Sequence, residues 1–184
     1  MPPIARAMLR SPENVIESLG YMFSELNIDL SDFAKDLIPL MSKQLIVKSE
    51  ETQKEATTSI KLFVLKCTSV EIIQYIIKYL FSVLNGSEGK LTMPIQKNMV
   101  LEAISNCSLN PSFNNQDCLK NFLDQFADFL KHETNDLTLH FAFEKIRFCL
   151  HNTEISTFHS SSLPRITSFF KVVLNFYFYY INII

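Results

Sequence analysis

Apolar side chains recur at intervals of three and four residues through most of this 184-residue chain. The clearest run holds Ile72, Ile73, Ile76, Ile77 and Leu80, which together form one wide apolar band on a helix. Glycine, which builds the tight turns of sandwiches, barrels and phosphate-binding loops, occurs only three times. The pattern therefore predicts an all-α fold of helices joined by short polar connections.

Polar side chains mark where most of these helices begin. Ser11 precedes Pro12, which suits the first position of a helix, and Ser49 precedes two glutamates that favour the positive helix end. Ser31 and Ser69 are predicted caps of the same kind. We expect helices near 12–27, 31–45, 49–67, 69–85, 92–104, 119–130 and 135–150, and a last one from about residue 163.

The expected helix starts repeat along the chain. Ser31 and Ser69 are separated by roughly 40 residues, as are Ser49 and Thr92, and this is the spacing of repeats made of two antiparallel helices. Residue identity between the units is poor, so the spacing alone gives only general support. The prediction is an α-solenoid of antiparallel helix pairs, HEAT/armadillo-like, over residues 1–171.

Charge and cysteine content limit the class of protein. The net charge is −2, so there is no global attraction to nucleic acid or anionic lipid. The four cysteines, Cys67, Cys107, Cys118 and Cys149, lie far apart and no secretory signal precedes them. We expect buried free thiols in a reducing cytosol.

Phenylalanines are concentrated in two stretches, 122–129 and 141–148. Their helical spacing is more typical of a core between repeats than of a ligand pocket. We therefore assign these rings to the core.

The segment 85–90 reads NGSEGK and is the nearest approach to a ligand-binding motif. A phosphate-binding P-loop needs four residues between its glycines and a hydroxyl residue after the lysine, whereas Leu91 follows here. The RNA clamp of KH domains also uses two glycines at this spacing, but Glu88 and the absence of strand patterns argue against it. The favoured interpretation is a helix-ending turn with Gly86 in the left-handed conformation and Gly89 at a second bend.

Motifs for metal binding or catalysis are not evident. The four histidines do not form the pair at i and i+4 that a helical zinc site uses, and Cys149 beside His151 gives at most two ligands. No Ser, His and Asp constellation stands out. We therefore predict no catalytic residue, no metal and no cofactor, and expect that the chain is not an enzyme.

The stretch 79–108, YLFSVLNGSEGKLTMPIQKNMVLEAISNCS, resembles the N-terminal HEAT region of the general-control translational activators, which act on the eukaryotic initiation factor 2 alpha kinase. The most specific part is the loop 85–92 followed by Gln96 and Lys97. Weaker similarity is found at 30–45, 129–146 and 163–171.

This resemblance implies a function. The family consists of very large HEAT-repeat proteins that bind ribosomes, sense stalled or collided ones and help to activate the kinase during amino-acid starvation. It implies that the chain is a non-enzymatic, ribosome-associated scaffold segment in the cytosol. The kinase would be engaged through parts of the full-length protein that are not present here. A generic HEAT/armadillo protein-binding adaptor is the alternative.

The candidate partner-binding residues are of two kinds. The first is the loop that matches the family which the chain resembles, and the second is a set of five lysines that could contact ribosomal RNA or protein. We expect no small-molecule substrate and no membrane partner. The candidates are Gly86, Ser87, Glu88, Gly89, Lys90, Lys43, Lys48, Lys54 and Lys97.

The last residues, 172–184, read VVLNFYFYYINII and depart from the resembling family, which continues as charged helices. They are too few to cross a bilayer, which takes roughly 20 residues. An apolar end buried by a partner and a membrane anchor remain alternatives. The departure favours a truncated or mis-spliced gene.

Overall fold

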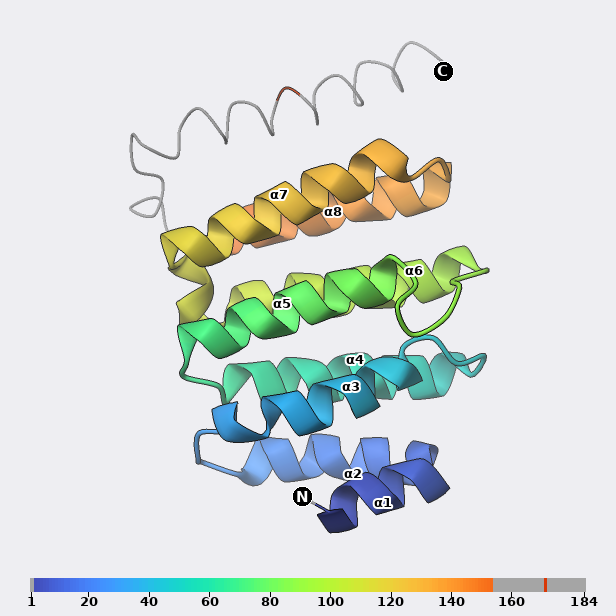
Figure 1. Ribbon diagram of the computed structural model, residues 1–184, viewed down its shortest axis with the longest axis vertical. Coiled ribbons are helices and arrows are strands. Elements are labelled where there is room, and N and C mark those ends of the chain that lie inside the picture. Colours follow the sequence, from blue (N-terminus) through green and yellow to red (C-terminus); the bar gives the residue numbers. More distant parts are fainter. Residues whose placement is uncertain (1, 154–170, 172–184) are drawn as a thin grey trace.

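A computed structural model describes residues 2–153 and 171 of the chain (Figure 1). This part contains eight α-helices, three short 3₁₀ turns and no strand, so the all-α prediction is confirmed. The predicted helix from about residue 163 and the tail 172–184 lie outside the described residues. The elements are α1 (Pro2–Arg10), α2 (Pro12–Glu25), η1 (Ser31–Phe33), α3 (Ala34–Gln44), α4 (Glu50–Leu65), α5 (Val70–Leu84), α6 (Pro94–Asn106), η2 (Cys107–Leu109), η3 (Pro111–Asn114), α7 (Gln116–His132) and α8 (Asp136–Asn152).

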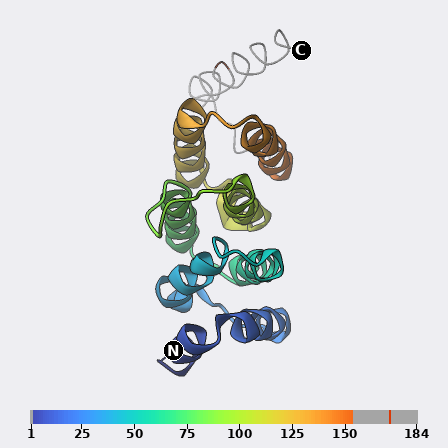
Figure 2. The same ribbon diagram turned by 90° about the vertical axis from the view of Figure 1, so that its right-hand side faces the viewer.

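The helices are stacked in successive pairs along the long axis of the molecule (Figure 1). Helix α1 packs against α2, α3 against α4, and α5 against α6. Figure 2 shows two rows, one of α1, α3, α5 and α7 and the other of α2, α4, α6 and α8. Each helix contacts the next member of its own row. Segments that are one helix pair apart in the sequence therefore lie next to each other in space.

Side-chain caps begin several of these helices as the sequence predicted. The Ser49 hydroxyl accepts a hydrogen bond from the backbone N–H of Thr52 at 3.3 Å, and the Ser69 hydroxyl accepts one from Ile72 at 3.4 Å. The Asn135 side chain caps α8 in the same way. Each of these bonds satisfies an amide that has no partner inside its own helix.

Four predicted details are wrong. Ser11 occupies the cap position of α2, but its side chain makes no capping hydrogen bond. Helix α1 was not expected, because its nine residues carry too short an apolar pattern to stand out. Ser31 does not cap α3, since the residue at that position is Phe33 and the Ser31 hydroxyl bonds elsewhere. Thr92 is not the cap of α6 either, because that position is taken by Met93.

The hydroxyl of Ser31 instead joins two successive inter-pair loops. It donates to the Asp29 carboxylate at 2.6 Å and accepts from the backbone N–H of Thr68 at 3.0 Å. The same carboxylate accepts the Thr68 backbone N–H at 3.2 Å. Hydrogen bonds from Ser31 and Thr68 lower the pKa of Asp29 to about 2.

We expect Asp29→Asn to remove part of the acid sensitivity of the fold. Because the folded-state pKa lies below the ordinary value of about 3.9, the ionised group stabilises the fold at neutral pH, and this contribution is lost as the pH falls towards about 2. Urea unfolding at about pH 6 and about pH 3 should show a stability difference from wild type that shrinks at the lower pH. An equal difference at both values would contradict this role of Asp29.

A single apolar core runs between the two rows, from Met8 to Cys149. All four cysteines are buried in it as free thiols, as predicted. Burial raises the pKa of Cys67, Cys118 and Cys149 to about 12. These thiols are therefore protonated at neutral pH and are poor nucleophiles.

Candidate partner-binding edge

The loops that join the two helices within a pair lie on one side of the stack, on the right in Figure 1. We call this side the loop edge and define it by residues 45–49, 85–93 and 133–135. It contains the predicted loop Gly86–Lys90 and the exposed Lys48, and Lys43 lies beside it in the last turn of α3. Six of the nine candidate residues, Lys48 and Gly86–Lys90, therefore lie in the loop edge, and Lys43 and Lys97 lie in the helix turns that adjoin it.

The turn at Gly86 ends α5. Gly86 has a φ of +91°, a conformation that favours glycine. Its N–H donates to the Val83 carbonyl at 2.9 Å, and the N–H of Ser87 donates to the Ser82 carbonyl at 3.0 Å. These two bonds form a Schellman cap, so the helix-ending interpretation is confirmed. Their amides bond to the protein's own carbonyls, which leaves them unable to cradle a phosphate.

Glu88 holds this loop against two helices. Its carboxylate accepts a hydrogen bond from the Tyr79 hydroxyl on α5 and lies 3.6 Å from the Lys43 ammonium on α3. Burial and the bond to Glu88 raise the pKa of Tyr79. Lys43 is about half exposed, so the ion pair contributes little energy but keeps the two groups adjacent.

Gln96 joins two neighbouring loops, a role that the sequence reasoning did not assign. Its side-chain oxygen accepts from the backbone N–H of Thr92 at 3.1 Å and of Met93 at 3.2 Å. Its amide nitrogen donates to the carbonyl of Ile46 in the preceding pair. The only available signal was the position of Gln96 three residues after the cap, where a capping glutamine is favoured.

Lys97 forms an ion pair within the protein. Its ammonium lies 2.6 Å from the Glu133 carboxylate, whose side chain is only 3% exposed. The other oxygen of Glu133 accepts the backbone N–H groups of Thr134 and Asn135, both at 2.9 Å. Burial alone would raise the pKa of Glu133, but these bonds together lower it below its usual value. A partner contact by Lys97 would have to compete with this ion pair.

We expect Lys97→Met to lower the free energy of unfolding by about 1–2 kcal/mol, because it leaves a buried carboxylate without its cation. Lys90→Met changes an exposed loop lysine and is expected to have no measurable effect. Urea denaturation monitored by circular dichroism measures both variants. Equal stabilities of the two would show that the Lys97 ion pair contributes nothing.

Lys48, Lys54 and Lys90 remain exposed. Lys48 and Lys90 belong to neighbouring loops of the loop edge. Lys54 is set apart from them on α4, where it lines a groove against α2. The candidate lysines therefore divide into two that share one open surface, two engaged with glutamates, and one on another face.

The described residues contain no cluster of three or more His, Cys, Asp or Glu side chains that could hold a metal ion. Within the same part of the chain, every helix is too short or too polar to cross a bilayer.

Comparison with known proteins gives matches over most of the described residues. The family described as "Stalled ribosome sensor GCN1 N-terminal" matches residues 1–91. Stalled ribosome sensor GCN1 of Mus musculus is 36% identical over 108 residues, which are 59% of this chain and 4% of that protein. Stalled ribosome sensor GCN1 of Homo sapiens is 32% identical over 141 residues, which are 76% of this chain and 5% of that protein. Protein ILITYHIA of Arabidopsis thaliana is 28% identical over 111 residues, 60% of this chain and 4% of that protein.

The chain thus spans 4% to 5% of the length of these relatives. No solved structure matches it.

Proposed function

Because this chain is a homologue of the N-terminal region of the stalled ribosome sensor GCN1, we propose that it is a non-enzymatic scaffold segment that associates with ribosomes in the cytosol. The match of residues 1–91 to that N-terminal family carries the proposal. The segment would serve a translational regulator that responds to stalled ribosomes and to amino-acid starvation. Activation of the initiation factor 2 alpha kinase would need regions of a longer protein.

We also propose that the stack is a HEAT-type solenoid. Three observations support this: the helices form two rows, each helix contacts the next in its row, and hydrogen bonds link positions about one repeat apart. Ser59 on α4 donates to the carbonyl of Ile16 on α2, 43 residues away, and Asn152 on α8 donates to Ser108, 44 residues away. Repeats of roughly 40 residues bring such positions together.

The loop edge is the surface that we assign to the ribosome. Its exposed Lys48 and Lys90 lie in neighbouring loops whose backbone is fixed by Gln96 and Glu88. Two exposed lysines on loops with a fixed backbone can bind phosphate or carboxylate groups of a large partner. The contacts would therefore be weakened by salt.

Sedimentation with polysomes tests the proposal. The tagged chain should migrate with ribosomal fractions at low salt and leave them at moderate salt. The double variant Lys48→Glu/Lys90→Glu should remain at the top of the gradient. As a matched control, Lys35→Glu/Lys120→Glu makes the same charge change at exposed positions near the starts of α3 and α7 and should migrate like wild type.

Two outcomes would overturn parts of this proposal. A folded wild-type chain that stays at the top of the gradient at low salt would reject ribosome association and leave a generic HEAT/armadillo protein-binding adaptor. Equal loss in both double variants would reject the loop edge as the specific surface. Circular dichroism of each variant separates lost binding from lost folding.

A further inference from the structure

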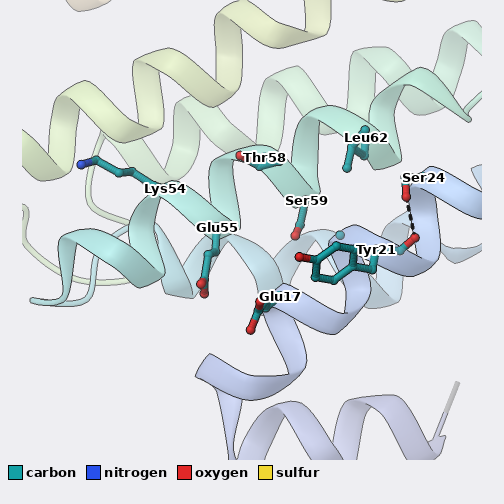
Figure 3. Close-up of a pocket in the computed structure, with 9 residues that line it drawn as sticks. Glu17, Tyr21, Ser24, Lys54, Glu55, Thr58, Ser59 and Leu62 are labelled. Carbon is teal, nitrogen blue, oxygen red and sulfur yellow. Dashed lines mark hydrogen bonds between the residues drawn. The ribbon is translucent and has the colours of Figure 1, made fainter.

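A groove of about 440 Å³ lies between α2 and α4, in the second row of helices (Figure 3). Glu17 and Tyr21 line it from α2, and Glu55, Thr58 and Leu62 line it from α4. Neither the ribosome proposal nor the candidate loop involves this surface.

The floor of the groove is fixed by a close approach of the two helices. The Ser59 hydroxyl on α4 donates to the Ile16 carbonyl on α2 at 2.8 Å. A β-carbon added at Gly20 would lie 2.9 Å from that hydroxyl oxygen, which is closer than such atoms pack. Because Gly20 has no side chain, the helices meet here and the surface above them stays hollow.

The groove has an excess of negative charge. Figure 3 shows the carboxylates of Glu17 and Glu55 on the same side of the groove, whereas the Lys54 side chain extends away from both. Burial, followed by the nearby charges of Glu17, Glu51 and Glu13, raises the pKa of Glu55. Across the described residues, none of these four glutamates forms an ion pair. No ion pair with a cation of the described residues therefore neutralises these carboxylates.

An exposed aromatic ring completes the site. Tyr21 is 70% exposed although it lies in the middle of α2, one residue after Gly20. A tyrosine ring next to carboxylates suits an arginine or lysine side chain, which can lie over the ring while its charge reaches the acids.

We propose that this groove binds a basic segment of a partner protein, with one arginine or lysine lying over Tyr21 and its charge held by Glu17 and Glu55. Charge complementarity favours a cationic protein segment and disfavours nucleic acid, which the same carboxylates would repel. The inference is independent of ribosome association, because it concerns other helices and the opposite charge.

Fluorescence anisotropy of the full chain with a labelled peptide of alternating arginine and glycine tests this binding. Glu17→Gln/Glu55→Gln should weaken binding about tenfold or more. Tyr21→Ala should weaken it about two- to fivefold. Lys54→Gln should tighten it, because it removes the positive charge of a lysine that lines the groove. Glu144→Gln, at an exposed position on α8, is the matched control and should bind like wild type.

Two further measurements test whether binding of the peptide depends on its charge and occurs in the groove. A peptide with citrulline in place of arginine has the same shape without the charge and should not bind. Amide chemical shifts of Gly20 and Thr58 should change on titration with the arginine peptide, which places the ligand in the groove. Because Glu17→Gln/Glu55→Gln relieves repulsion between carboxylates, the double variant should stay folded, as circular dichroism would verify.

Three outcomes would overturn the proposal. They are equal weakening by Glu144→Gln, an unaltered affinity in the double glutamine variant, and groove shifts that depend on protein concentration without peptide. The last would identify a second copy of the chain as the occupant.

Discussion

Replacing Phe122 with alanine should lower the free energy of unfolding by about 3–5 kcal/mol. Phe122 is fully buried on α7. Its ring centroid lies 5.1 Å from that of Phe113, 5.4 Å from Phe126 and 6.1 Å from Phe81 on α5. The substitution removes the ring that touches all three others, and the stacked backbones around it can collapse only partly into the cavity.

Urea unfolding curves measure this loss, and Phe148→Ala serves as the control. Phe148 is 39% exposed on α8 and should cost much less than Phe122. Phe122→Leu keeps most of the volume and should fall between the two. If Phe122→Ala costs no more than Phe148→Ala, the aromatic cluster does not join α5 to α7 as described.

Asn110→Ala should cost about 2–4 kcal/mol, although asparagine in a turn usually contributes little. Asn110 is 2% exposed, and its amide nitrogen donates to the carbonyls of Val64 at 2.6 Å and Cys67 at 2.8 Å. Its side-chain oxygen accepts the backbone N–H of Ser112 at 2.8 Å. Alanine removes all three bonds and leaves buried polar groups of two successive pairs without these partners.

Asn110→Asp distinguishes the two bonds that the amide nitrogen donates from the one that the side-chain oxygen accepts. Aspartate can still accept from Ser112, but its carboxylate would face the two carbonyl oxygens that the amide now serves. It should therefore be at least as destabilising as alanine. Asn115→Ala, which removes an exposed cap of α7, should cost about 1 kcal/mol. Wild-type stability of Asn110→Asp would show that the bonds to Val64 and Cys67 are unimportant.

Local patterns predicted the helices because their causes are local. The apolar spacing of α5 and the caps Ser49 and Ser69 each depend on residues within one or two turns, and the left-handed Gly86 depends on the end of its own helix. Short α1 escaped detection for the same reason, since nine residues hold too few periodic positions.

The remaining features depend on partners that are distant in the sequence. Ser31 bonds to a loop 37 residues away, Gln96 to one 50 residues away, and Lys97 to a glutamate 36 residues away. Nothing in the local sequence shows which of two lysines faces a glutamate and which faces solvent. The groove likewise depends on Gly20 meeting Ser59 across two helices, and in the sequence Gly20 is only a weak point in a helix.

The polar links between pairs occur at both ends of the helices: at one end through Asn110, and at the other through Gln96 and Lys97. Because these polar contacts lie at both ends of the helices, they restrict twisting as well as bending of one helix pair relative to the next. Each of these contacts connects a helix pair only to the adjacent pair, so an applied force is transmitted from one pair to the next along the stack. When force is applied to its two ends, the stack should unfold one helix pair at a time, beginning with the pair whose contacts to its neighbours are weakest.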